Sequence, residues 1–477
     1  MMIVLHRIIR AILLVGYVGS CCLAQIPTLV QHISSGRDNT SGYSSPTYRF
    51  FLPNPTLPGN CLILRFEHIS ALTTSSVKTD KGDTFSLGPS INSGGHATES
   101  YYVAASTGSQ IISVVTSGTI GGPEDEASGD LSEFYNTSCV ADASGSSSSR
   151  NITLSTTTAN DLIWESGDDT STLTPTTTSM TVGSGYTMLH GNTSQGTFAQ
   201  YQTGAATGSQ TVSFQTSDSD SWQSVAIAFK SALTGTAPPS TGIRIVNMYG
   251  EIFGNNTHTM YVPCSGNLLI GMWSSPLVTV SAVSSSPSGT WSQGASIRDN
   301  AGSGIAQIFY GQGMNCNSTL TMTPTYSGPS SGGLNFLVML DVAGANASAH
   351  DVDKTNTGDQ TSGSTLTTAT ITPTTANGLV LDASSQWGCT DISASPGIYA
   401  GIATNSANSD VCAPTNTTNS TLNEDNNLAL YYNSSTATVS FTYTDTGPVS
   451  YWASVASAFK SGPITVNPPT GLTAVPH

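Results

Sequence analysis

The stretch NDLI at Asn160–Ile163 begins an apolar strand pattern, and three more stretches of this 477-residue chain repeat it. The other copies are Asn60–Ile63, Asn267–Ile270 and Asn377–Val380. Each copy is followed by a Gly/Ser-rich turn region and then by an aromatic strand pattern, such as Phe198–Tyr201. A repeat of about one hundred residues is too long for one rung of a solenoid and suits a small β-sandwich, or half of a larger one. The repeat therefore predicts strand-turn-strand modules.

The copies are related at two levels, and this sets the expected number of domains. Thr107–Gln110 recurs as Thr207–Gln210, which pairs the first two copies. At longer range Trp222–Ser231 recurs as Trp452–Ser461, so this strand closes a double unit. We expect two tandem antiparallel β-sandwich domains of jelly-roll-like form, each an internal duplication, at residues 26–232 and 243–462.

Residues 233–242 are expected to form a short, stiff linker, because they contain the pair Pro238-Pro239. Strands are indicated by alternating polar and apolar residues, as in Ser440–Tyr443. The 47 glycines and 23 prolines disfavour helix interiors. The predicted fold class is therefore all-β, with Trp222 and Trp452 at matching places in the sandwich cores.

The first 24 residues have the pattern of a secretory signal peptide. Arg7 and Arg10 supply a basic start, an apolar run of about ten residues follows, and small residues precede the expected cleavage after Ala24. An alternative is that the residues around Cys21 act as a lipobox, so that Cys21 carries a lipid anchor. No later stretch approaches the roughly 20 apolar residues that cross a bilayer, so a secreted or cell-surface protein without a transmembrane segment is expected.

The charge of the chain argues against one class of partner. Only 9% of the residues are charged, and the formal net charge is −16. Such a surface repels the phosphates of nucleic acids and of anionic membranes. Nucleic acid is therefore not an expected partner.

The cysteines predict a disulfide framework. Six remain beyond the leader, an even number in a chain that is expected to be exported. Fifteen pairings of six cysteines exist, and proximity in the sequence favours three pairs within the domains: Cys61 with Cys139, Cys264 with Cys316, and Cys389 with Cys412. A zinc site on these cysteines is not expected, because the chain has no Cys-x-x-Cys and no histidine close to them.

Motifs for catalysis or cofactor binding are absent from the sequence: there is no nucleophile elbow, no His-Glu-x-x-His and no phosphate-binding glycine loop. No catalytic residue and no cofactor are therefore assigned. Calcium needs six to eight oxygens from several chain segments, and Asp218 with Asp220, in an expected turn between strands, are the candidate ligands; solvated turn acids are the alternative. The histidines are scattered singly and are expected to have surface or structural roles: His68, His96, His190 and His258.

A family resemblance rests on the second copy. Asn160–Ile163, the Gly185–Thr187 turn, the aromatic strand at Tyr201 and the closing strand Val225–Lys230 resemble the exported β-sandwich repeats of large bacterial surface and extracellular proteins. Val466–Ala474, within a Pro-rich tail at residues 463–477, is similar to the first strand of a fibronectin type III module and indicates a truncated module or a remnant. The resemblance implies export and a sandwich fold but no defined activity.

Three functions from different classes follow. The first is a non-catalytic secreted or cell-surface protein with an adhesion, matrix or macromolecule-binding role. The second is a carbohydrate-binding protein, in which exposed tryptophans stack on sugar rings; the candidates are Trp164, Trp273, Trp291 and Trp387. The third is a jelly-roll polysaccharide hydrolase or lyase, with acids such as Glu67 or Glu165 in a cleft.

Overall fold

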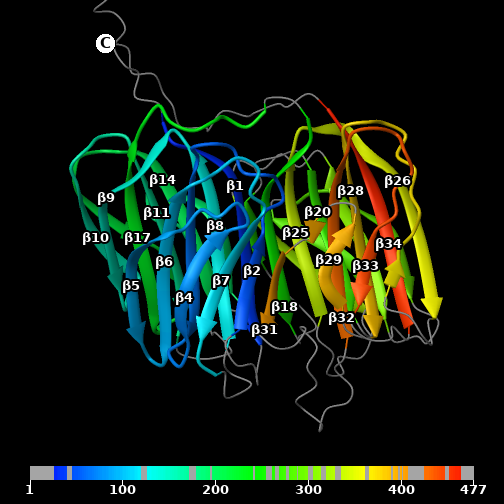
Figure 1. The fold of residues 1–477 in the computed structure, drawn as a ribbon, viewed down its shortest axis with the longest axis horizontal. Helices are drawn as coiled ribbons and strands as arrows, with labels where there is room; N and C mark the ends of the chain where they lie inside the picture. Colours follow the sequence, from blue (N-terminus) through cyan, green and yellow to red (C-terminus); the bar gives the residue numbers. More distant parts are fainter. Residues whose placement is uncertain are drawn as a thin grey trace, which may run out of the picture.

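The structure is a computed structural model, and it describes the chain at these residues: 26–39, 46–119, 126–170, 179–193, 196–239, 242–253, 260–263, 268–275, 279–286, 288–298, 304–312, 319–327, 335–359, 365–387, 390–395, 398–399, 401–406, 424–445 and 451–462. These residues form an all-β fold (Figure 1), which confirms the predicted fold class. Among them no helix is long and apolar enough to cross a membrane. The expected leader and the Pro-rich tail lie outside the described residues.

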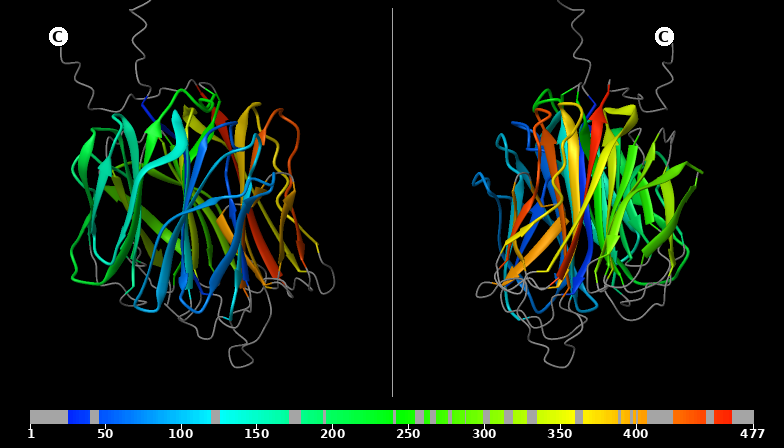
Figure 2. Two further views of the ribbon diagram at one scale, coloured as in Figure 1. Left: turned by 60° about the vertical axis from the view of Figure 1, so that its left-hand side comes forward. Right: turned by 90° about the vertical axis from the view of Figure 1, so that its right-hand side faces the viewer.

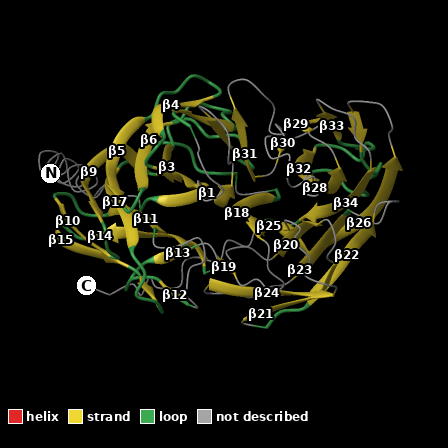
Figure 3. Cartoon of the chain, turned by 90° about the horizontal axis from the view of Figure 1, so that it is seen from below, coloured by secondary structure: helices red, strands yellow, loops and turns green. Residues whose placement is uncertain are grey.

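A ten-stranded sheet forms the middle layer and takes strands from both halves of the chain (Figure 3). In spatial order its strands are β22 (Trp291–Arg298), β23 (Ile305–Gln312), β20 (Leu268–Ser275), β25 (Asn335–Ala343), β18 (Arg244–Phe253), β1 (Thr28–Asn39), β8 (Glu126–Tyr135), β3 (Cys61–Ile69), β6 (His96–Ala104) and β5 (Ser86–Ser93).

An eight-stranded sheet covers one face of the middle layer. In spatial order it contains β21 (Thr279–Ser286), β24 (Thr319–Ser327), β19 (Met260–Pro263), β13 (Thr187–Asn192), β14 (Thr197–Ala205), β11 (Asp161–Asp169), β17 (Trp222–Ser231) and β9 (Thr137–Ser147). Two small sheets pack on its outer face, and they pair β10 (Asn151–Thr156) with β15 (Gly208–Ser213) and β12 (Met180–Thr181) with β16 (Gln215–Thr216).

Two sheets lie side by side on the other face of the middle layer, and Figure 2 shows the layers from two further sides. The four-stranded sheet contains β31 (Gly401–Ser406), β2 (Pro46–Phe51), β7 (Ile111–Ser117) and β4 (Thr73–Thr79). The five-stranded sheet contains β26 (Ala345–Asp359), β34 (Tyr451–Ser461), β28 (Gly378–Trp387), β32 (Glu424–Asn433) and β30 (Ile398–Tyr399). A last sheet contains β27 (Thr365–Thr367), β33 (Thr442–Asp445) and β29 (Thr390–Ser395).

The middle layer is covered on both faces, so its strands bury side chains on both of them. Every residue of β3 is buried. Leu62, Leu64 and Phe66 enter the core that faces the four-stranded sheet, whereas Cys61 and Ile63 enter the core that faces the eight-stranded sheet. Alternate side chains of one strand thus stabilise two different layers, as the period of two requires.

The two halves of the chain repeat each other in strand register. In β17, Trp222 lies opposite Asp169 of β11, and in β34, Trp452 lies opposite Gln386 of β28. Both tryptophans are buried at these equivalent positions, as the sequence predicts. Asn160 and Asn377, the first residues of two of the repeats, both have positive φ, at 65° and 59°. Asparagine tolerates this left-handed conformation better than most residues, which explains its presence at these two positions; in the first copy the positive φ falls on Gly59 instead.

The sheets continue from one half of the chain to the other. β1 and β18 pair in parallel, with His32 opposite Asn247. β13 pairs with β19 and β2 pairs with β31, so both outer layers also contain strands from both halves of the chain. One hydrophobic core cluster contains residues of both halves, from Ile33 to Phe459. The double units that the sequence indicates therefore share sheets and a core; their boundaries as tandem domains remain a prediction.

A disulfide joins Cys61 of β3 to Cys139 of β9 and so connects the middle layer to the eight-stranded sheet. This is the pair that proximity in the sequence favours. Cys264, Cys316, Cys389 and Cys412 lie outside the described residues, and their two pairs remain predictions.

Replacing both Cys61 and Cys139 with alanine is expected to lower the free energy of unfolding by about 2–4 kcal/mol, because the crosslink restricts the unfolded chain. The bridge spans 78 residues of sequence. Urea denaturation of the variant and of the wild type measures the difference. A loss below about 0.5 kcal/mol would contradict a stabilising role for the bridge.

Candidate functional site

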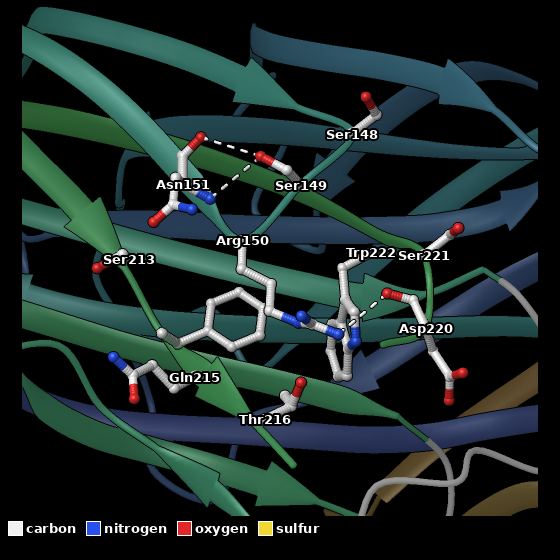
Figure 4. Close-up of a pocket in the computed structure, with 11 residues that line it drawn as sticks. Ser148, Ser149, Arg150, Asn151, Ser213, Gln215, Thr216, Asp220, Ser221 and Trp222 are labelled. Atoms are coloured by element: carbon white, nitrogen blue, oxygen red, sulfur yellow. Dashed lines mark hydrogen bonds between the residues drawn. The ribbon is translucent and has the colours of Figure 1, made fainter. Parts of the chain in front are cut away.

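A polar pocket of about 460 Å³ lies beside β9, β10 and β17, at the edge of the eight-stranded sheet. Its walls come from the turn between β9 and β10, from the ends of β15 and β16, and from the segment that leads into β17. The lining side chains are mostly hydroxyls and amides, grouped around one arginine (Figure 4): Ser148, Ser149, Arg150, Asn151, Ser213, Phe214, Gln215, Thr216, Asp220, Ser221 and Trp222.

The turns around the pocket are held by their own side chains. Ser147 Oγ accepts a hydrogen bond from the Ser149 backbone N–H at 3.1 Å, a local bond that suits a turn rather than a strand. Asp218 Oδ1 accepts hydrogen bonds from Thr216 Oγ1 at 2.7 Å and from the Asp220 backbone N–H at 3.4 Å. The Ser-rich segment before Asn151 and the Asp-x-Asp segment before Trp222 thus form the rim of the pocket.

Arg150 connects the two rim segments. Its Nη2 atom donates to Asp218 Oδ1 at 2.5 Å and to the backbone oxygens of Asp218 and Asp220 at 3.2 and 3.0 Å. The guanidinium carbon lies 5.9 Å from the centre of the Trp222 ring (Figure 4), a cation–π distance. Nη1 makes no hydrogen bond within the described residues. The pocket therefore contains a cation in a fixed position that retains hydrogen-bonding capacity.

The acids that the sequence proposes for calcium meet a third one here. Asp169, at the end of β11, joins Asp218 and Asp220, and one oxygen of each lies within 4.8 Å of the others. Oxygen donors of this kind suit calcium, which needs six to eight of them. The Arg150 guanidinium already pairs with Asp218 and so offsets part of the negative charge of this cluster. Calcium at this cluster remains a prediction, with Asp169 as the added ligand.

Two of the four candidate tryptophans do not offer a ring to a sugar. Trp164 and Trp273 are fully buried, so for them the stacking prediction is wrong. Trp164 lies between two layers, where Nε1 donates to Ser132 Oγ at 3.1 Å. Trp291 is half-buried, packs edge-on against Phe309 and lines a second pocket of about 250 Å³. The side chain of Trp387 lies outside the described residues.

The two acids of the hydrolase hypothesis are buried in different surroundings. Oε1 of Glu67 in β3 lies 2.7 Å from His96 Nδ1. Glu165 in β11 accepts a hydrogen bond from Gln200 of β14. Burial raises the Glu165 pKa to about 8, so this carboxyl is protonated at neutral pH. Neither acid lines the pocket of Figure 4.

The histidines of the sequence analysis fall at several places. His68 is buried, its Nδ1 lies 2.7 Å from the Ile69 carbonyl oxygen, and Glu99 beside it offsets the effect of burial and raises its pKa. His96 faces Glu67. His190 meets His32 and Asp130 between two layers. His258 lies outside the described residues.

The central residue of the pocket, Arg150, is absent from the sequence-based candidates. One signal was available: an arginine stands alone in the run GSSSSRN, in a chain with only 13 lysines and arginines. Its importance depends on Asp218, which is 68 residues away. No family model matches the chain, and no curated protein is significantly similar to it.

Proposed function

We propose that this chain is a non-catalytic secreted or cell-surface β-sandwich protein that binds neutral glycans in the pocket around Arg150. The observation that carries the proposal is the pocket itself: a fixed guanidinium is surrounded by hydroxyl and amide side chains. Sugar hydroxyls both donate and accept hydrogen bonds, and so do Ser, Thr, Asn and Gln side chains. Arg150 adds donors for sugar oxygens.

The charge around the pocket supports a neutral ligand, and the burial of Trp222 indicates how such a ligand would be held. The formal net charge of −16 and the acids beside the pocket disfavour polyanions. Trp222 lines the pocket but is only 1% exposed, so recognition here rests on hydrogen bonds rather than on ring stacking. Trp291 beside the second pocket is the position where a ring can contribute.

The wider assignment follows from the sequence patterns. We infer an exported protein of the bacterial β-sandwich repeat type, built as two jelly-roll-like double units, each an internal duplication. The signal-peptide pattern and the Cys61–Cys139 disulfide support export, and the matched registers of Trp222 and Trp452 support the duplication. A non-catalytic role is consistent with the missing catalytic motifs.

Replacing Arg150 with glutamine is expected to weaken glycan binding by about tenfold to a hundredfold, because a hydrogen bond to a charged group contributes about 1.5–3 kcal/mol. A glycan array identifies the ligand, and titration calorimetry compares the two proteins.

Lys230→Gln is the matched control, because Lys230 pairs with Asp142 at 3.4 Å and does not line the pocket. A thermal melt shows whether each variant is folded. Binding that is equal in folded Arg150→Gln and wild type would refute the pocket assignment. Turnover of a polysaccharide that stops in Glu67→Gln or Glu165→Gln would favour the hydrolase instead.

A further inference from the structure

Three side chains from three strands meet between the middle layer and the eight-stranded sheet. His32 of β1 and Asp130 of β8 come from the middle layer, and His190 of β13 comes from the sheet above it. Asp130 Oδ1 lies 2.9 Å from His190 Nδ1 and 3.8 Å from His32 Nε2. All three residues are at most 1% exposed. Apart from one another, the three atoms have no hydrogen-bond partner within the described residues.

The other polar atom of each side chain is held in place. His32 Nδ1 lies 2.9 Å from Ser132 Oγ, and His190 Nε2 lies 3.2 Å from Thr197 Oγ1. Asp130 Oδ2 accepts hydrogen bonds from Arg65 Nε at 2.8 Å and from Ser166 Oγ at 2.5 Å. Each side chain therefore has one atom anchored by the surrounding protein and one atom that contacts only the other two members of the group, and these three atoms converge. At metal centres, a ligating side chain is oriented in this way by a hydrogen bond between its other polar atom and the surrounding protein.

The second half of the chain shows that the fold does not require these polar residues. Strand register places Met248 at the position of His32, Val338 at that of Asp130 and Leu340 at that of Ser132. Met272 takes the place of Arg65 and Ala383 that of Ser166. All five lie in one hydrophobic core cluster. An apolar core therefore serves the same scaffold, and the buried polar set in the first half needs another explanation.

We propose that His32 Nε2, His190 Nδ1 and Asp130 Oδ1 bind a divalent first-row transition ion, with Zn²⁺ as the first choice. Two imidazole nitrogens and one carboxylate oxygen are a common ligand set for such ions, whereas calcium and magnesium prefer oxygen alone. Asn247 is the candidate for a fourth ligand: it lies opposite His32 in register, and its Oδ1 has no hydrogen-bond partner among the described residues. The ion would connect the two layers at the junction of the two halves.

The test measures metal binding to the full, oxidised chain. The protein is loaded with Zn²⁺, passed over a desalting column and analysed for metal by mass spectrometry; one equivalent of zinc per chain is expected, with a higher thermal midpoint in zinc than in chelator. His32→Gln and His190→Gln are each expected to weaken zinc binding by more than roughly a hundredfold, so that zinc is lost on the column, because the loss of a supporting group alone costs tenfold to a hundredfold. His350→Gln is the matched control, since His350 pairs with Asp353 at 3.0 Å elsewhere.

Two further measurements separate the alternatives. Asp218→Asn leaves zinc binding unchanged if the ion lies at the histidines, and abolishes it if the ion lies at the acidic cluster of the pocket. Cobalt bound in place of zinc gives an absorption spectrum without thiolate charge-transfer bands if no cysteine is a ligand. Wild-type protein that retains no zinc, zinc that is retained in folded His32→Gln and His190→Gln, or a thiolate band would each overturn the proposal.

Discussion

Arg65→Met is expected to lower the free energy of unfolding by about 3–5 kcal/mol, because it leaves a buried carboxylate without its cation. Arg65 is fully buried; its Nε donates to Asp130 Oδ2 at 2.8 Å and its Nη1 donates to Ser128 Oγ at 2.9 Å. Urea denaturation in the presence of a chelator measures the loss. Lys81→Met is the control, since Lys81 is 48% exposed and its pair with Asp80 contributes less than about 1 kcal/mol.

The second half of the chain supplies a rescue for this variant. At the equivalent positions, Met272 lies opposite Val338 in an apolar core. Arg65→Met combined with Asp130→Val is therefore expected to recover part of the loss, since apolar pairs replace buried ion pairs at little cost. If Arg65→Met alone costs no more than Lys81→Met, the buried ion pair does not have the role assigned to it.

Glu165→Gln is expected to stabilise the protein at pH 8 by about 4 kcal/mol and to leave it unchanged at about pH 3.5, below the pKa of the unfolded chain. Burial raises the Glu165 pKa from 4.5 to about 8, so the folded protein keeps a proton that the unfolded chain releases. Between these two values the stability of the wild type falls with rising pH, at about 1.4 kcal/mol per pH unit from this residue.

Glutamine is neutral throughout this window and keeps the shape of the protonated acid. It can still accept the hydrogen bond from Gln200 Nε2. Urea denaturation of both proteins at several values between about pH 3.5 and pH 8 tests the prediction. The wild type and the variant converge at about pH 3.5, which serves as the internal control. Stability curves that run parallel across the window would contradict a protonated Glu165 in the folded protein.

Several features of the fold could be predicted from the sequence because neighbouring residues encode them. The alternation in Val212–Phe214 and the repeated Asn-x-Leu-Ile stretches identify strands, and the recurrence of Trp222–Ser231 as Trp452–Ser461 places two tryptophans at equivalent positions. Proximity in the sequence favours the Cys61–Cys139 pair among fifteen possible pairings, and the structure contains it. The tryptophan sites could not be judged in this way, because a strand pattern does not say whether one face or both faces of a strand are covered. Trp164 and Trp273 lie in sheets that are covered on both faces.

The amino-acid sequence by itself determined the strand patterns, the repeats and the absence of familiar catalytic motifs, and it favoured one disulfide. The tertiary structure decided which strands share a sheet, including the parallel pairing of β1 with β18, and it brought Arg150 to Asp218 and His32 to Asp130 and His190. The physical reason is the separation along the sequence of the residues that specify each feature. The period of a strand depends on residues two apart, whereas the pairing of β1 with β18 joins segments more than 200 residues apart, and no local pattern in either strand specifies that partner. Both proposed sites likewise combine side chains from segments that local patterns do not connect.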